Sequence, residues 1–241
     1  LFQKISLHDM LTFERAESLS LTCDDPDLPV DDSNLVLRAA KLLGAPPVHI
    51  HLEKRIPAGG GLGGGSSNAA TTLMVLDRMF GLQRNDLPEL ALRLGSDVPF
   101  FLLGGTAYAT GRGEELTPLP AAAPIPLLLL FPDERVLTRD AFGRIGTYSP
   151  PLGIERYRAM IDDDLLAHGE ELANDFEEPV FALLPRLREL RERLIAVGAI
   201  WARMSGSGST LVGAFANQQE RDRASAAWTG SIRAISAETM A

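Results

Sequence analysis

Residues 57–70 read Pro57-Ala-Gly-Gly-Gly-Leu-Gly-Gly-Gly-Ser-Ser-Asn-Ala-Ala70, and six of the seven positions from Gly59 to Gly65 are glycine. Glycine lacks a Cβ atom, so such a run lets backbone N–H groups approach a ligand closely and adopts positive φ angles freely. We therefore expect a loop whose backbone surrounds a ligand. A flexible Gly/Ser linker is the alternative interpretation.

The residues after the glycines are typical of a capped helix. Ser66 and Ser67 carry hydroxyls suited to capping a helix N-terminus. Beyond them, apolar residues recur at helical spacings of four, three and four, at Ala69, Leu73, Leu76 and Phe80. A helix N-terminus with converging N–H groups binds phosphate through those donors and the helix dipole. The helix argues against the linker interpretation, because a flexible linker would not need a capped amphipathic helix directly after it.

The two familiar nucleotide motifs fit this stretch poorly. Gly59, Gly61 and Gly64 satisfy G-x-G-x-x-G, but that dinucleotide motif needs a buried strand running straight into the first glycine. Here Val48–Leu52 alternates like a half-exposed strand, and charged residues and Pro57 intervene. A Walker loop needs a lysine after its last glycine, and none follows.

Two further segments contain features of a binding site. Leu94-Gly-Ser-Asp-Val-Pro-Phe-Phe101 ends a predicted helix and begins a predicted strand, which leaves Asp97 at the junction. Met204-Ser-Gly-Ser-Gly-Ser-Thr210 is a second loop of small residues, between strands expected at 200–204 and 211–215. A last short strand is expected near residues 231–235.

Together IPAGGGLGGGSSNAATTL, GSDVPFFL, GTAYATGRGE and MSGSGST resemble the GHMP kinase superfamily, over roughly residues 1–215. GSDVPFF with GRGE is most similar to the members that phosphorylate a cytidine diphosphate-linked alcohol in the non-mevalonate isoprenoid pathway. The resemblance implies an α+β fold of two domains. Residues 1–123 would form an ATP-binding domain like domain 2 of ribosomal protein S5, and residues 124–241 a ferredoxin-like C-terminal domain.

The resemblance also implies the chemistry, which is transfer of the γ-phosphoryl group of ATP, with Mg²⁺, to an alcohol. Asp97 would be the general base or orienting carboxylate and would contact the substrate, as would Thr138, Gly206, Ser207 and Gly208. The residues expected to bind the nucleotide are Asn34, Leu35, Lys54, Pro57, Gly59, Gly60, Gly61, Leu62, Gly63, Gly64, Gly65, Ser66 and Ser67.

Plainer interpretations of three of these features stay open. Asp97 is also the kind of aspartate that hydrogen-bonds to its own turn. Residues 204–210 have the composition of a tight β-turn. Lys54 also fits a solvated charge at the end of a strand.

Members of the superfamily branch begin with a strand that carries a lysine and an asparagine, followed by an Asp-Gly-Tyr-His turn. This sequence opens with Leu1-Phe-Gln-Lys-Ile-Ser-Leu7, which resembles the strand after that turn. We therefore expect a truncated or incompletely recorded kinase. The alternatives are another superfamily kinase, acting on mevalonate-like alcohols or homoserine, and a nucleotide-binding module without turnover.

The composition limits which partners and which cellular compartment can be expected. A net charge of −9 over 241 residues argues against a nucleic-acid surface, and the apolar run 125–131 is too short to cross a membrane. The single cysteine, Cys23, fits a reducing cytoplasm. We expect a cytoplasmic monomer or homodimer with a small-molecule substrate. His49 and His51 are expected to be surface residues, and no metal-binding residue is predicted.

Overall fold

The computed structural model describes residues 1–228 and 232–241. Within them the chain forms two compact units. The first unit contains residues 1–2, 7–58 and 63–118, and the second contains residues 3–6, 59–62 and 119–241. The glycine run is therefore divided after Leu62, with its first part in the second unit and its remainder in the first.

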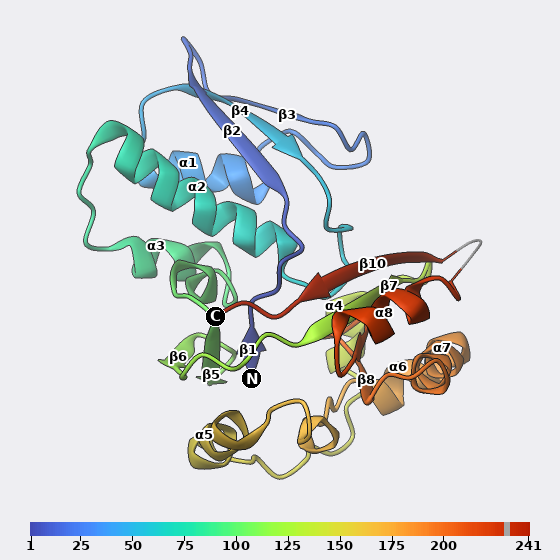
Figure 1. Ribbon diagram of the computed structural model, residues 1–241. Coiled ribbons are helices and arrows are strands. Elements are labelled where there is room, and N and C mark those ends of the chain that lie inside the picture. The colour runs from blue at the N-terminus through green and yellow to red at the C-terminus, as the bar shows by residue number, and fades with distance from the viewer. Residues whose placement is uncertain (229–231) are drawn as a thin grey trace. The chain divides into compact units, whose positions relative to one another are not determined.

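The first unit is built on a three-stranded sheet in the order β2-β4-β3. The edge strand β2 (Met10–Arg15) runs antiparallel to β4 (Val48–Glu53), and β3 (Ser20–Cys23) runs parallel to β4. Alternate residues of β4 are buried, as the sequence alternation predicts. Helices α1 (Leu35–Leu43) and α2 (Gly64–Phe80) cover one face of this sheet (Figure 1).

Helix α2 confirms the helical period after the glycines, and it begins earlier than the serines suggest. Its N-cap is Gly63, in the left-handed conformation with φ of 67°, and no side chain caps it. The expectation that Ser66 or Ser67 caps the helix is wrong, because both lie within its first turns. Ala69, Leu73 and Leu76 are fully buried, so the packed apolar face stabilises a helix whose first residues are poor helix formers.

The rest of the first unit follows α2. Helix α3 (Leu87–Leu94) leads through a turn to the short 3₁₀-helix η1 (Pro99–Leu102), and β5 (Thr106–Thr110) pairs with β6 (Glu115–Pro118) and with Phe2 of β1 (Phe2–Gln3). The strand expected to begin after Asp97 is wrong, because residues 99–102 form η1 instead. Pro99 fixes a helical φ and lacks the N–H that a strand would use. The rings of Phe100 and Phe101 then pack edge to face, 5.1 Å apart.

The second unit contains a four-stranded antiparallel sheet in the order β10-β7-β9-β8, formed by β7 (Pro126–Phe131), β8 (Trp201–Met204), β9 (Leu211–Ala214) and β10 (Arg233–Glu238). In chain order, helices α4 to α7 lie between β7 and β8, and helix α8 lies between β9 and β10. Together with the strand order, this gives the ferredoxin-like arrangement. The last strand was expected near 231–235, of which Ser231 lies outside the described residues.

Helices of the second unit pack on this sheet. Helix α7 (Pro185–Ala196) contacts β8 and β9, and α8 (Gln218–Ser225) contacts β7 and β10. The remaining helices are α4 (Thr138–Phe142), α5 (Ile154–Asp163), η2 (Gly169–Glu171) and α6 (Glu177–Leu183). Among the described residues of the whole chain, no helix is long and apolar enough to cross a membrane.

Candidate functional site

The first part of the glycine run packs against the second small-residue loop, within the second unit. The Ser205 hydroxyl donates a hydrogen bond of 2.9 Å to the carbonyl oxygen of Gly61, which lies 144 residues away in the sequence. The Thr210 N–H donates to the Gly60 carbonyl at 3.2 Å. A Cβ atom on Gly61 would lie 2.2 Å from the Ser205 carbonyl oxygen, so only glycine fits there. The two loops singled out in the sequence therefore lie side by side.

Asn174 fixes the second loop from outside it. Its Nδ2 donates to the carbonyl oxygens of Met204 at 2.7 Å and Gly206 at 2.9 Å, and its Oδ1 accepts from the Phe176 N–H. Sequence reasoning did not assign Asn174 to the site. The available signal was its turn-forming residue type shortly before a helix, α6, and that pattern does not reveal a contact with residues 204–206.

Two of the predicted substrate-binding residues meet at this loop. The hydroxyls of Thr138 and Ser207 lie 3.0 Å apart, and Ser207 is buried. Thr138 is the first residue of α4, directly after an exposed residue, Leu137. Gly206 and Gly208 both have positive φ, of 53° and 92°, and they shape the loop. The structure therefore brings Thr138 to the predicted loop of residues 204–210.

The remainder of the glycine run forms the N-terminus of α2, within the first unit. The first hydrogen bond of the helix runs from the Ser67 N–H to the Gly63 carbonyl at 2.9 Å, which leaves the N–H groups of residues 64–66 ahead of it. No side chain caps them, and the first turn holds no acidic residue. Such donors at the positive end of a 17-residue helix fit a phosphate group.

One predicted residue, Leu35, adjoins this helix start, as does the ring of Phe101. A Cβ on Gly65 would lie 3.5 Å from Leu35, and one on Gly63 would lie 2.9 Å from the ring of Phe101. The side chain of Asn34 caps α1, since its Oδ1 accepts from the Val36 N–H at 3.0 Å while its Nδ2 donates to Pro29 at 2.7 Å. A contact between Asn34 and a nucleotide base therefore stays a prediction.

Asp97 lies in the turn between α3 and η1, and its neighbour η1 carries the Phe101 ring against Gly63. A Cβ on Gly113 would lie 3.5 Å from Asp97 Oδ1, so the 111–114 turn also approaches this carboxyl. Although the residue is exposed as a whole, partial desolvation by the surrounding protein raises the pKa of the Asp97 carboxyl. A raised pKa makes the carboxylate a stronger base.

Lys54 occupies a different environment from a solvated one. Its ammonium group is 2.7 Å from Asp9 Oδ2, with side chains exposed by only 6% and 0% respectively, and it also donates to the Ile56 carbonyl. The interpretation of Lys54 as a solvated strand-end charge is therefore wrong. Asp9 has no feature in the sequence that would single it out.

Neighbouring hydroxyls bind the two histidines on β4. His49 lies 2.9 Å from Ser20 and 3.2 Å from Thr22, and His51 lies 2.9 Å from Thr22. Within residues 1–228 and 232–241, no group of three or more histidine, cysteine, aspartate or glutamate side chains could hold a metal ion.

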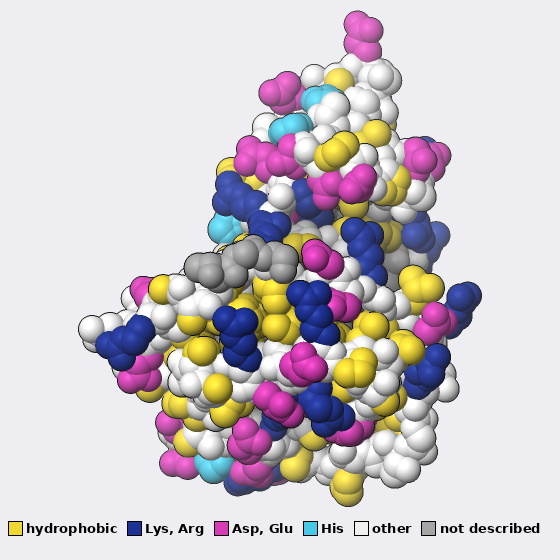
Figure 2. All heavy atoms as spheres, turned by 90° about the vertical axis from the view of Figure 1, so that its right-hand side faces the viewer, with side chains coloured by type: hydrophobic (Ala, Val, Ile, Leu, Met, Phe, Trp, Pro, Cys, Tyr) yellow, Lys and Arg dark blue, Asp and Glu magenta, His cyan; other side chains and the backbone are white. Residues whose placement is uncertain are grey.

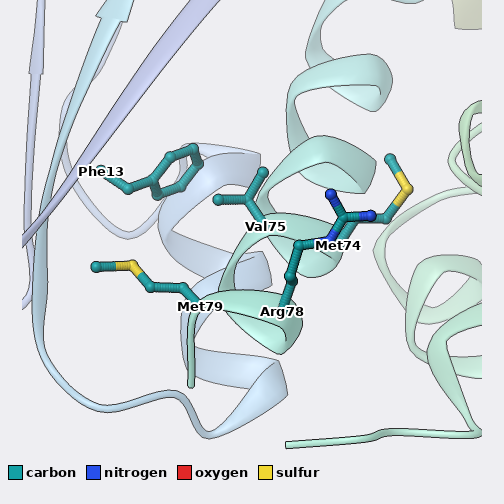
Figure 3. A pocket seen from close by; sticks show the side chains of 5 residues that line it. All are labelled: Phe13, Met74, Val75, Arg78 and Met79. Atoms are coloured by element: carbon teal, nitrogen blue, oxygen red, sulfur yellow. The ribbon is translucent and has the colours of Figure 1, made fainter. Parts of the chain in front are cut away.

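A hollow of about 620 Å³ lies along the C-terminal half of α2 (Figure 3). It is lined by Phe13 of β2 and by Met74, Val75, Arg78 and Met79. None of the predicted site residues lines this hollow. The proposed phosphate contacts lie instead at the opposite, N-terminal end of the same helix.

The chain matches known proteins along most of its length. Residues 34–105 match the GHMP kinases N terminal domain, and residues 157–233 match the GHMP kinases C terminal domain. The 4-diphosphocytidyl-2-C-methyl-D-erythritol kinase of Prosthecochloris aestuarii is 40% identical in an alignment 246 residues long, and this alignment covers 97% of this chain and 85% of that protein.

Solved structures agree with this match. A crystal structure of 4-(cytidine 5'-diphospho)-2C-methyl-D-erythritol kinase superimposes with a TM-score of 0.82 at 39% identity, over 98% of this chain and 87% of that one. The mevalonate kinase of Methanococcus jannaschii gives a TM-score of 0.74 at 14% identity, over 99% of this chain and 90% of that one. The second similarity shows the fold alone.

Proposed function

The chain belongs to the 4-diphosphocytidyl-2-C-methyl-D-erythritol kinases of the GHMP kinase superfamily, and from that premise we propose that it phosphorylates the 2-hydroxyl group of 4-diphosphocytidyl-2-C-methyl-D-erythritol with ATP. This reaction belongs to the non-mevalonate route to isoprenoid precursors. The observation that carries the proposal is the uncapped, glycine-rich N-terminus of α2.

The proposed roles of the residues follow from their chemistry. When bound, ATP with Mg²⁺ supplies an activated γ-phosphoryl group. The N–H groups of the glycine run and of the first turn of α2 bind the phosphates, and Ser66 contributes its hydroxyl to the phosphates or the metal ion. Asn34, Leu35 and Lys54 line the adenine pocket. Transfer needs positioning and charge neutralisation rather than covalent chemistry from the protein.

Asp97 would accept the proton of the 2-hydroxyl group, whose oxygen forms a bond to the γ-phosphorus as the bond to the departing ADP breaks. The raised pKa of its carboxyl supports this role, because a stronger base takes the proton more readily. Thr138, Gly206, Ser207 and Gly208 bind the substrate. We assign residues 1–123 to the ATP-binding domain and residues 124–241 to the C-terminal domain, a boundary close to the point after Pro118 where the compact units divide.

The wider context is also proposed. A cytoplasmic enzyme with a small-molecule substrate fits the single cysteine and the net charge of −9. On the face drawn in Figure 2, Lys and Arg side chains are interspersed with Asp and Glu, an arrangement that suits a small-molecule enzyme rather than a nucleic-acid binder. We propose a monomer or a homodimer, which light scattering would decide.

The decisive experiment measures ADP release from Mg-ATP with and without 4-diphosphocytidyl-2-C-methyl-D-erythritol. Substrate-dependent release that CDP inhibits is the expected result, because only a cytidine-recognising site responds to CDP. Release with mevalonate or homoserine in place of the cytidine compound would assign a different superfamily activity. ATP binding without any release would instead support a nucleotide-binding module.

A further inference from the structure

The carboxylate of Asp9 is fully buried and accepts four hydrogen bonds in the first unit. Its Oδ1 accepts from the backbone N–H groups of Arg55 and Ile56, both at 2.8 Å. Its Oδ2 accepts from Lys54 Nζ at 2.7 Å and from Asn68 Nδ2 at 2.8 Å. We call these five residues the Asp9 cluster.

The strand register explains why these residues meet. Met10, the first residue of β2, pairs with Glu53, the last residue of β4. Asp9 therefore lies beside Lys54, one step beyond the end of the ladder, where the backbone N–H groups of Arg55 and Ile56 have left the sheet. An acceptor at this point hydrogen-bonds these two backbone donors.

The charge on Asp9 is maintained by its partners. Burial alone would raise the pKa of this carboxyl, but the hydrogen bonds from Ile56, Lys54, Arg55 and Asn68 together lower it below its usual value. The ionised form is therefore the one that the folded protein favours.

The donors come from the two ends of the glycine run. Arg55 and Ile56 directly precede Pro57, and Asn68 lies in the second turn of α2, just after the run. A Cβ atom on Gly64, the first residue of that helix, would lie 3.4 Å from Lys54 Nζ. One carboxylate with its lysine thus holds the segments on either side of the run.

A simpler interpretation is a buried ion pair that only stabilises the fold. Such a pair is weak evidence for stability, since desolvation offsets much of the attraction. The cluster has a more specific arrangement, because all four donors flank the same glycine-rich stretch. Glycines lose more conformational freedom on ordering than other residues, so fixing both ends of the run lowers the cost of arranging its N–H groups around a ligand.

We propose that Asp9 is a positioning residue for the nucleotide, holding the two ends of the glycine run so that the N–H groups at the start of α2 converge on phosphate. The proposal rests on the proposed function, since the ligand is the triphosphate of ATP. Asp9 contacts no substrate itself and acts through Arg55, Ile56 and Asn68.

The test replaces Asp9 with Asn, which keeps the shape and one acceptor but removes the charge and presents a donor to Lys54 and Asn68. Hydrogen exchange of the backbone amides measures the loop without any ligand. We expect exchange at residues 55–67 to become at least tenfold faster in Asp9→Asn. By calorimetry, the Kd for Mg-ATP should rise about tenfold, and KM for ATP should rise more than KM for the alcohol substrate.

Two further variants make the result decisive. Asp32→Asn breaks an exposed pair, with Lys41 at 2.6 Å, and should change neither the exchange at 55–67 nor the Kd. Asn68→Ala removes only the link to α2, and it should change exchange and Kd in the same direction as Asp9→Asn by a smaller factor. Asn68→Ala therefore keeps the proposal testable if Asp9→Asn does not fold.

The outcomes separate the two proposals. Unchanged exchange at 55–67 in Asn68→Ala and in folded Asp9→Asn, or faster exchange with an unchanged Kd for Mg-ATP, would overturn the role of Asp9 while leaving the kinase intact. A wild-type chain that binds no ATP would overturn the proposed function and the nucleotide-positioning role together.

Discussion

Asp97 is the residue on which the proposed reaction depends, because it is the proposed acceptor for the hydroxyl proton. Asp97→Asn keeps the size of the side chain and removes its basicity. We expect turnover to fall by about two or more orders of magnitude, the usual scale for a lost acid–base group. Steady-state ADP release measures this, and a loss of tenfold or less would remove Asp97 from that role.

The pH dependence provides a second measurement on the same residue. Desolvation raises the pKa of Asp97, so its carboxyl keeps the proton to a higher pH than a free aspartate does. A base must be ionised, and kcat/KM should therefore fall as pH is lowered through this raised pKa. The folded state binds this proton more readily than the unfolded state, so the contribution to stability is lost as pH rises through the same range. In Asp97→Asn, the acid limb of the residual activity should disappear.

Gly61 and Gly59 form a matched pair at the residue scale. Both have nearly the same positive φ, 76° and 75°, but a Cβ on Gly61 would collide with the Ser205 carbonyl whereas one on Gly59 would meet nothing within 4 Å. Each alanine variant carries the same backbone strain, about 1–2 kcal/mol. We expect Gly61→Ala to destabilise the chain further and to weaken ATP binding more. Equal thermal unfolding temperatures would contradict the packing argument.

The Asp9 cluster shows what residue-level reasoning from the sequence could not reach. The glycine run and residues 204–210 were recognisable from their small residues, and Asp97 through the family resemblance of the segment that contains it. Asp9 is an ordinary aspartate in sequence, and its environment arises only from the register that sets it beside Lys54 and from the helix that brings Asn68. Such a site needs three segments to be placed in space at once.

At the scale of elements, most of the first unit was predictable. Helix α1 lies between Asn34 and Gly44, residue types that commonly cap and end helices, and β4 shows the alternation expected of it. The 3₁₀-helix η1 was not predictable, because its aromatic residues favour strands. Tertiary packing determines the helical conformation of this segment. The ring centroids of Phe2 and Phe100 lie 5.2 Å apart, and the ring of Phe101 packs against Gly63.

The loop between β8 and β9 depends on an element outside it. Asn174→Ala removes both hydrogen bonds to the Met204 and Gly206 carbonyls, at a cost of about 1–3 kcal/mol for the groups left unpaired. Because the same loop carries Ser207 beside Thr138, we expect KM for the alcohol substrate, measured by steady-state ADP release, to rise several-fold.

Asn217→Ala is the control for this prediction. Asn217 caps α8 by accepting from the Glu220 N–H at 2.9 Å, so its loss should cost about 1 kcal/mol of stability. KM should stay as in the wild type. A rise in KM of similar size in both variants would show that general destabilisation, rather than the loop, changes the activity.

At the scale of the whole molecule, each unit has its own apolar core, one formed by residues such as Ile50 and Leu73 and the other by residues such as Leu128 and Leu194. The boundary expected between residues 123 and 124 falls in a stretch of small residues and prolines, residues 121–126. The strand order of each sheet was not predictable from periodicity, since pairing between distant strands leaves no local signal.

Ligand binding should be visible in the stability of the whole chain. A ligand that binds only the folded state stabilises it by about 2.7 kcal/mol at one hundred times its Kd. Mg-ATP at that concentration should raise the unfolding temperature by several degrees in a chain of this size. AMP lacks the β- and γ-phosphates that the α2 N-terminus is proposed to bind, so it should give a smaller shift at the same concentration. An equal shift with AMP would contradict the proposed phosphate site.

The buried lysine has a practical consequence for covalent labelling. The sequence contains three lysines, Lys4, Lys41 and Lys54. The side chain of Lys41 is 52% exposed, whereas that of Lys54 is 6% exposed and paired with Asp9. An amine-acylating reagent should therefore modify Lys41 quickly and reach Lys54 only when the chain around the glycine run opens. Peptide mass spectrometry after a timed pulse of reagent would measure the rate at which Lys54 is acylated, and that rate reports how often this part of the chain opens.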